Sequence, residues 1–182
     1  GFNNGNRYND FWAYNPSLNS WVQKADFVGG IRTYALCFAV GNRGYIGLGY
    51  DLNTPKNDLW EYNPATNSWV QKASFPGVAR INHVSFSIGT KGYLGTGVVP
   101  GVGLLKDFWE FNPGIDGALG IWTQKADFGG TERTAAVGFS IGGKGYIGTG
   151  KNGGGVLKDF WEYDPSLNTW IKRADYGGSG TA

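Results

Sequence analysis

Large apolar residues alternate with small or polar residues in three segments of the chain, with the two-residue period of a β-strand. The segments are LCFAV at 36–40, VSFSI at 84–88 and VGFSI at 137–141. Neither the large nor the small positions carry a charge, which is typical of a strand that is buried on both faces. We therefore expect each segment to be the innermost strand of a sheet.

A glycine-bracketed turn and a second short strand are expected after each of these segments. The turns are GNRG, GTKG and GGKG, and the strands that follow are predicted at 45–49, 93–97 and 146–150. Glycine supplies the positive φ angles that tight hairpins need. Glycine within a strand also weakens it unless another group comes close. We expect the approaching group to be a tryptophan of the same or the adjoining unit.

The third and fourth strands are predicted from a motif that the chain repeats four times: NDFWAYNP, NDLWEYNP, KDFWEFNP and KDFWEYDP. Its tryptophans stand at positions 12, 60, 109 and 161, which are 48, 49 and 52 residues apart. Such a period is typical of repeat architectures. A second tryptophan and a cation follow each copy after a proline turn, and the cations, expected to protect an outer sheet edge, are Lys24, Lys72, Lys125 and Arg173.

Composition narrows the class of protein. The chain has 182 residues with 32 glycines and 16% aromatic residues, and the fixed period favours a packed fold over a disordered one. The net charge of +2 is spread along the chain, which argues against a nucleic-acid partner. No apolar run is long enough to span a membrane. A single cysteine, Cys37, excludes an intrachain disulfide.

Four antiparallel strands in each unit of about 50 residues describe one blade of a β-propeller. The order of an arginine, an inner strand, GYIGxG, a variable loop, DFWEYNP and a tryptophan resembles kelch repeats, in particular the glycine-rich kelch repeats of secreted bacterial proteins. The resemblance implies an all-β, kelch-type β-propeller segment that is extracellular or at the cell surface. The expected units are a half blade at 1–29, with third and fourth strands only, and complete blades at 30–78, 79–130 and 131–182.

Three and a half blades do not close a ring, so we expect further blades of the same chain or a second chain to complete it.

One arginine precedes each inner strand, and the set is Arg32, Arg80 and Arg133. If these side chains lie at the rim of a central channel, their guanidinium groups could hold carboxylates or acidic sugars. An arginine in every blade is more simply a structural pin that pairs with the repeated carboxylates Asp58, Asp107 and Asp159. We keep the three arginines as candidate ligand-binding residues beside this structural interpretation.

His83 is the single histidine, at the position that Ala35 and Ala136 occupy in the other units. The sequence contains no second histidine and no second cysteine with which it could build a metal site. We expect His83 to be packed or to line a channel, and we predict no catalytic residue, metal or cofactor. The repeated Glu61, Glu110 and Glu162 stand on separate blades, so they do not predict a hydrolase.

The loops between second and third strands differ most among the units, at 1–9, 50–57, 98–106 and 151–158. Binding residues are disproportionately found in such loops. The predicted contacts are Tyr50, Asp51, Asn53 and Asn152. We therefore expect a non-catalytic module that binds a protein or glycan partner.

The alternative is a carbohydrate-active propeller enzyme of sialate-mutarotase type. It would use the three arginines together with Glu132 or His83.

Overall fold

The computed structural model describes residues 1–3 and 5–178. Residue 4, in the predicted loop 1–9, and residues 179–182, at the end of the predicted last blade, lie outside the described residues. The described chain is all-β, and it contains no helix that could cross a membrane.

Antiparallel sheets of four strands form the body of the protein, and in each sheet neighbouring strands follow one another along the chain. The first comprises β5 (Leu36–Val40), β6 (Arg43–Gly47), β7 (Leu59–Asn63) and β8 (Ser68–Lys72). The second comprises β9 (Val84–Ile88), β10 (Lys91–Gly95), β13 (Phe108–Asn112) and β14 (Ile121–Lys125). The third comprises β15 (Val137–Ile141), β16 (Lys144–Gly148), β19 (Phe160–Asp164) and β20 (Thr169–Arg173).

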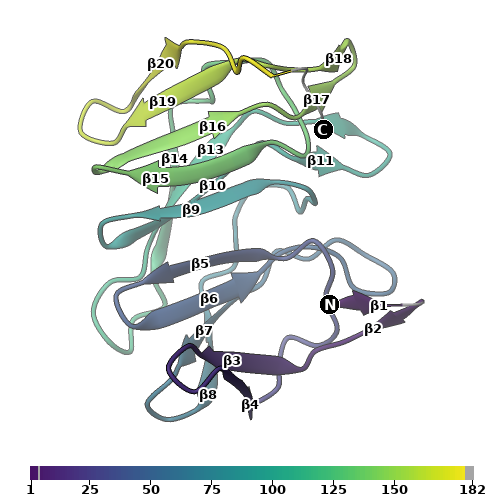
Figure 1. Ribbon diagram of the computed structural model, residues 1–182, viewed down its shortest axis with the longest axis vertical. Coiled ribbons are helices and arrows are strands. Elements are labelled where there is room, and N and C mark those ends of the chain that lie inside the picture. Colours follow the sequence, from purple (N-terminus) through teal and green to yellow (C-terminus); the bar gives the residue numbers. More distant parts are fainter. Residues whose placement is uncertain (4, 179–182) are drawn as a thin grey trace.

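A two-stranded sheet of β3 (Phe11–Asn15) and β4 (Ser20–Lys24) precedes them. The sheets follow one another in chain order along the long axis, like blades of a propeller (Figure 1). Asn67, in the turn between β7 and β8, has φ 51°, as the proline turn predicts.

The second strand of each blade lies two residues earlier than the sequence predicts. β6 covers Arg43–Gly47 in place of 45–49, and β10 and β16 are displaced in the same way. The chain leaves the sheet at Leu48, Thr96 and Thr149, where φ is 49°, 57° and 58°. These left-handed residues turn the backbone out of the ladder, which ends the strand before the last glycine.

The second-strand glycines make room for strand three, not for a tryptophan. A Cβ placed on Gly95 would lie 2.6 Å from the ring of Phe108, and one on Gly47 would lie 2.2 Å from the carbonyl oxygen of Asp58. The prediction of a visiting tryptophan is therefore wrong for these positions. A tryptophan does crowd a glycine of the connecting loop, because a Cβ on Gly129 would lie 2.7 Å from the Trp161 ring.

Each blade places its large inner side chains on the small inner face of the next blade. Phe38 of β5 covers Gly92, and Phe86 of β9 covers Gly145. In return, Ser85 and Ser87 of β9 donate hydrogen bonds to carbonyl oxygens of β5. Two buried apolar clusters result, one at each of these interfaces.

Within the described residues, β9 is the inner strand that has a neighbouring blade on both faces. Cys37 and Ala39 on the small face of β5 are exposed, and so are Val137 and Phe139 on the large face of β15. The expectation that every inner strand is buried on both faces is therefore wrong for β5 and β15. The alternating pattern indicates a strand that can be buried on both faces. In β5 and β15 the described chain buries one face only.

The fourth-strand cations do not all protect an edge. Lys72 is buried, forms an ion pair of 3.0 Å with Glu61 and donates a hydrogen bond to the carbonyl oxygen of Ala118 in the next blade. Arg173 pairs with Glu162 in the same manner within its own sheet. The edge-protection prediction is wrong for Lys72, because its ammonium group links strands and blades instead.

The variable loops lie together at one end of the molecule, on the right in Figure 1, and we call this end the loop face. Short hairpins form in three of them. These are β1 (Phe2–Asn3) with β2 (Asn6–Arg7), β11 (Val98–Val99) with β12 (Gly103–Leu104), and β17 (Lys151–Asn152) with β18 (Gly155–Val156). Single bridges tie the loops to the segments before the inner strands, from Tyr50 to Thr33, Val98 to Ile81 and Lys151 to Thr134.

Candidate functional site

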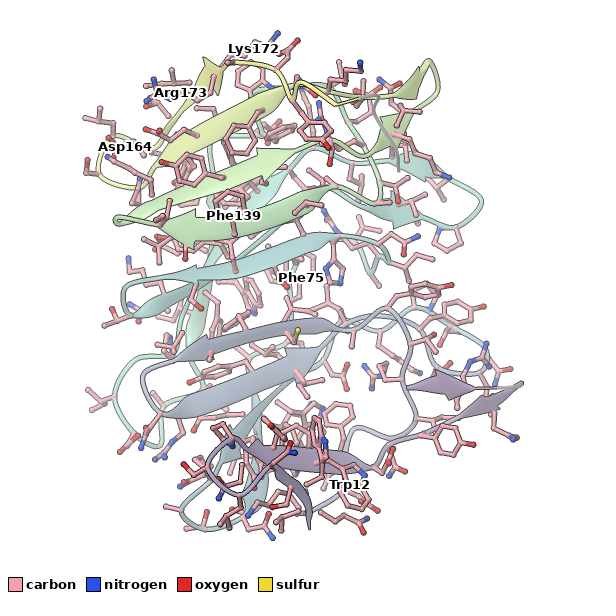
Figure 2. The ribbon with its side chains drawn as sticks, viewed as in Figure 1. Trp12, Phe75, Phe139, Asp164, Lys172 and Arg173 are labelled. Atoms are coloured by element: carbon pink, nitrogen blue, oxygen red, sulfur yellow. The ribbon has the colours of Figure 1, made fainter. Side chains whose placement is uncertain are left out.

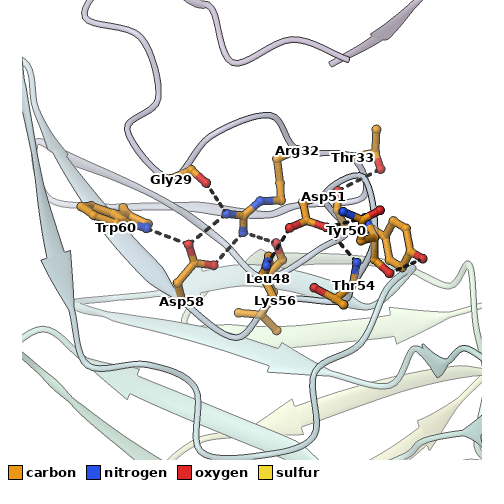
Figure 3. Close-up of polar contacts among 11 residues, drawn as sticks. Gly29, Arg32, Thr33, Leu48, Tyr50, Asp51, Thr54, Lys56, Asp58 and Trp60 are labelled. Atoms are coloured by element: carbon orange, nitrogen blue, oxygen red, sulfur yellow. Dashed lines mark hydrogen bonds and ion pairs between the residues drawn. The ribbon is translucent and has the colours of Figure 1, made fainter. Parts of the chain in front are cut away.

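The recurring arginines lie inside the blades, beneath the loop face. Arg32 holds the carboxylate of Asp58 through two hydrogen bonds, of 2.6 and 2.9 Å (Figure 3). The same guanidinium group donates to the carbonyl oxygens of Leu48 and Gly29, each at 2.7 Å. One side chain thereby joins the loop before β5, the end of β6 and the start of β7.

The other two blades repeat this arrangement. Arg80 binds both carboxylate oxygens of Asp107, and Arg133 binds those of Asp159 at 2.7 Å. The guanidinium carbon atoms of the three arginines lie over the rings of Phe27, Phe75 and Phe128, at 5.4, 5.1 and 4.6 Å from the ring centres. The predicted pairing with the repeated aspartates is confirmed, and such bidentate, aromatic-stacked geometry is what arginine provides and lysine cannot.

Each aspartate also accepts a hydrogen bond from the indole N–H of the tryptophan two residues later, for example from Trp109 to Asp107 at 2.7 Å. Burial alone would raise the pKa of Asp107 and Asp159. The hydrogen bonds from arginine and tryptophan more than offset this effect and hold both pKa values below the ordinary range. The carboxylates stay ionised, and the arginine donors that face them have no capacity left for a ligand.

The arginines therefore act as pins within the blades and do not line a channel rim. Arg80 and Arg133 have no exposed surface. This placement gives no support to a ligand-binding role for their guanidinium groups.

Arg32 differs from its counterparts because its Nε has no hydrogen-bond partner among the described residues. It borders a hollow of about 480 Å³, lined by Gly1, Arg7, Arg32, Thr33, Tyr34 and Ala35. The Nε of Arg7 is also buried without a partner in the described part of the chain. Arg7 and Arg32 both border this hollow, and their Nε atoms are buried.

Both ring nitrogens of His83 are buried, and neither has a hydrogen-bond partner among the described residues. Burial, with the nearby charge of Arg80 adding to it, lowers the pKa of His83 to about 4. The imidazole is therefore neutral near pH 7. Within residues 1–3 and 5–178, no group of three or more metal-ligating side chains gathers around it or elsewhere.

The polar residues predicted in the loop 50–57 bind one another. Asp51 accepts hydrogen bonds from the backbone N–H groups of Asn53 and Thr54, at 2.7 and 2.8 Å, and an ion pair of 2.6 Å joins it to Lys56 (Figure 3). The Tyr50 hydroxyl donates to the carbonyl oxygen of Asn53. The hydrogen bond from Lys56, followed by those from the backbone, lowers the pKa of Asp51. These residues shape the loop.

Asn152 has the same kind of role in the hairpin of β17 and β18. Its side-chain oxygen accepts from the N–H of Gly154, and its amide nitrogen donates to the hydroxyl of Thr131. The predicted polar residues are thus brought to one end of the molecule. The side chains of Tyr50, Asp51 and Asn152 are occupied by contacts within their own blades, whereas Asn53 is exposed and contributes backbone groups to these contacts.

Apolar side chains are among the exposed groups of these loops, and the sequence reasoning did not select the following three. Leu52 is 58% exposed, Val102 83% and Val156 51%. Between the second and third blades a hollow of about 610 Å³ opens at the same end, bordered by Leu104, Leu105, Lys106, Asp107, Glu132 and Gly153. An isolated apolar residue between polar residues or glycines of a loop, such as Leu52 or Val102, was the signal available in the sequence.

No family model matches the sequence, and no curated protein matches it. Among solved structures the chain is similar to that of YjhT, with a TM-score of 0.74 and 21% sequence identity. The match covers 88% of this chain and 57% of the YjhT chain, so this chain spans little more than half the length of that structure. At this identity the likeness establishes the fold alone, and the chain has an all-β, propeller-like fold of four-stranded antiparallel sheets.

Proposed function

We propose that the chain is a non-catalytic, kelch-type β-propeller module that binds a protein or glycan partner through its loop face. In this proposal the half blade at 1–29 and the blades at 30–78, 79–130 and 131–182 form the scaffold, and the protein acts outside the cell or at the bacterial cell surface. The repeated motifs that motivate the kelch assignment recur along the whole chain.

One observation carries the proposal, namely the division between repeated and variable positions. The repeated charged residues satisfy one another inside the blades, whereas the positions that differ between blades gather on one face with apolar tips in solvent. Scaffold positions must recur, whereas binding positions are free to differ. Solvent-exposed valine and leucine on otherwise polar loops suit a partner surface that has both apolar and polar groups.

The test compares two triple variants, each of which replaces three exposed apolar residues. The first, Leu52→Asp with Val102→Asp and Val156→Asp, alters the loop face. The control, Leu18→Asp with Ile115→Asp and Leu167→Asp, alters exposed turns at the opposite end of the blades, on the left in Figure 1.

The unmodified protein is screened against a glycan array and purified bacterial envelope proteins, and each hit is then measured with both variants. We expect at least one saturable interaction, lost in the loop-face variant and kept in the control. The absence of any hit, or equal loss in both variants, would contradict the proposal.

A further inference from the structure

The turn between β13 and β14 departs from the repeat and contacts the preceding blade. It covers eight residues, 113–120, whereas the equivalent turns at 64–67 and 165–168 cover four. The backbone N–H of Ala73 donates to the carbonyl oxygen of Leu119, at 2.8 Å. Scaffold positions recur in every blade, whereas functional positions are free to differ. The long turn is therefore a place where a function specific to one blade can lie.

The long turn and the first complete blade border a hollow of about 460 Å³. The turns that form it lie at the end opposite the loop face, on the left in Figure 1. The first complete blade contributes the turn between β5 and β6 with Arg43, and also Tyr45 and Glu61. The second contributes Thr90 and residues 112–116. Two blades thus build one site with a cation and a carboxylate in its wall.

Glu61 has closer partners than Arg43. The Tyr45 hydroxyl donates to its carboxylate at 2.6 Å, and the buried ammonium group of Lys72 forms an ion pair with it at 3.0 Å. The Nε of Arg43 lies 3.5 Å from this carboxylate and has no hydrogen-bond partner among the described residues. Because Lys72 already balances the charge of Glu61, the charge of Arg43 is available to a second anion.

Asp116 of the long turn faces Arg43, but the contact is loose. Its Oδ1 lies 3.5 Å from Nη2 of Arg43, whereas a guanidinium–carboxylate hydrogen bond is typically about 2.8 Å long. The Asp116 side chain is 91% exposed. Exposed ion pairs of this kind contribute little to stability. A carboxylate from solution can therefore replace that of Asp116 at small cost.

Arg43 also differs from the residues at the same position of the other complete blades. These are Lys91 and Lys144, and each pairs closely with a carboxylate of its own blade, at 2.7 Å with Glu110 and 2.5 Å with Asp164. Both ion pairs of Arg43 among the described residues are 3.5 Å long. The planar guanidinium group can hold a carboxylate through two parallel hydrogen bonds, which an ammonium group cannot do.

We propose that this hollow binds a small ligand through one carboxylate, which Arg43 holds in place of Asp116. Val40 and Pro113 border the hollow with apolar groups, and Thr90 borders it with a hydroxyl group. Pockets of this kind fix a ligand by apolar contact and a few placed polar groups. The ligand therefore has a short apolar body beside its carboxylate. This site lies apart from the loop face and does not depend on the function proposed for that face.

The experiment compares two ligands that differ in one charge. The probe is N-acetylaspartate amide, whose carboxylate is that of an aspartate side chain, and the control is N-acetylasparagine amide, which has nearly the same shape. Each is titrated into the full chain at constant pH and ionic strength, and backbone amide NMR shifts report affinity and location. We expect millimolar binding of the probe, with saturable shifts at residues 41–43 and 114–116, and no saturable shifts with the control ligand.

Two variants test the assigned roles. Arg43→Lys introduces the residue type of the other two complete blades and removes the planar fork, so it should weaken probe binding about fivefold or more. Lys144→Gln, at the equivalent position of the third blade, should leave the affinity unchanged. Asp116→Asn removes the competing carboxylate from an exposed position and should tighten probe binding several-fold.

Equal binding of the two ligands would overturn the proposal, and so would the absence of saturable shifts. Unchanged affinity in Arg43→Lys or in Asp116→Asn would contradict the role assigned to that residue and overturn the proposal as well. Saturable shifts confined to other parts of the chain would show that the carboxylate binds elsewhere. The loop-face triple variant should bind the probe unchanged, so this test and that of the proposed function fail independently.

Discussion

The half blade and the middle blade contain nearly the same motif in two different surroundings. In the middle blade, Trp109 packs on Phe75 and Asp107 binds both Arg80 and the Trp109 indole. In the half blade, Trp12 is 45% exposed and its indole donates to Asp10, which forms no ion pair with an arginine among the described residues. The motif is therefore sufficient for a strand pair and its turn, while the neighbouring blade and the arginine supply the burial.

The largest difference is expected for the repeated aspartate. Asp107→Asn leaves the buried guanidinium of Arg80 without its countercharge, which should cost about 3–5 kcal/mol of unfolding free energy. Asp10→Asn alters one exposed hydrogen bond and should change stability by about 0.5 kcal/mol or less. Urea denaturation of the two variants measures both effects. Similar losses would mean that the arginine pin does not distinguish the two blades.

The second tryptophan provides the next contrast. Trp122 lies 5.1 Å from the Phe75 ring and donates to the carbonyl oxygen of Ala73 in the preceding blade, whereas Trp21 is 64% exposed. Trp122→Ala should cost about 3 kcal/mol, and Trp21→Ala about 1 kcal/mol or less. The same denaturation assay tests this pair, and an equal cost would contradict the role assigned to the preceding blade.

The buried histidine gives a pH-dependent contrast between blades. The pKa of His83 is lowered to about 4 in the folded chain, below the value of an unfolded histidine. Between pH 6.5 and pH 4 the unfolded chain binds this proton and the folded chain does not, so stability falls as the pH is lowered. The loss should reach about 3 kcal/mol at pH 4.

His83→Ala introduces alanine, which the first complete blade has at the equivalent position, Ala35. The substitution removes the part of the pH dependence that His83 causes. Carboxylates such as Asp107, whose pKa is lowered, also lose stability at low pH, but they do so equally in both proteins. The variant should therefore become more stable relative to the parent as the pH falls from 7 to 4. A constant difference would show that His83 becomes protonated in the folded chain.

The smallest effect is expected at two equivalent glycines of the second strands, Gly44 of β6 and Gly92 of β10. Gly92→Ala forces a Cβ into the Phe38 ring and should cost about 1–3 kcal/mol. Gly44→Ala meets open space and should change stability by about 0.5 kcal/mol. Thermal unfolding of the two variants resolves the difference. If Gly44→Ala destabilises as much as Gly92→Ala, the space at Gly44 is already filled.

The regular part of this fold could be predicted from the sequence. Strand alternation, the glycine turns and the proline turn at Asn67 are set by residues close together in the chain, so local preferences suffice. The pairing of Arg80 with Asp107 was also open to prediction, because both residues recur in every complete blade.

Features that depend on another blade could not be predicted in the same way. Lys72 is buried because the longer turn before β14 places the carbonyl oxygen of Ala118 over its ammonium group. The second strand ends early because Thr96 takes a left-handed conformation that its residue type disfavours. Asp51 lies in a loop of the loop face, as the sequence predicts. Its carboxylate, however, binds the backbone N–H of Asn53 and the ammonium group of Lys56 within the same loop.

Native-state hydrogen exchange measures the difference between the edges of β3 and β13 directly. The amides of β13 should be protected along the whole strand, because β10 and β14 bind both of its edges. The amides of β3 that do not pair with β4 should exchange at least about a hundredfold faster than their β13 counterparts. Equal protection of β3 and β13 in the free chain would contradict the account.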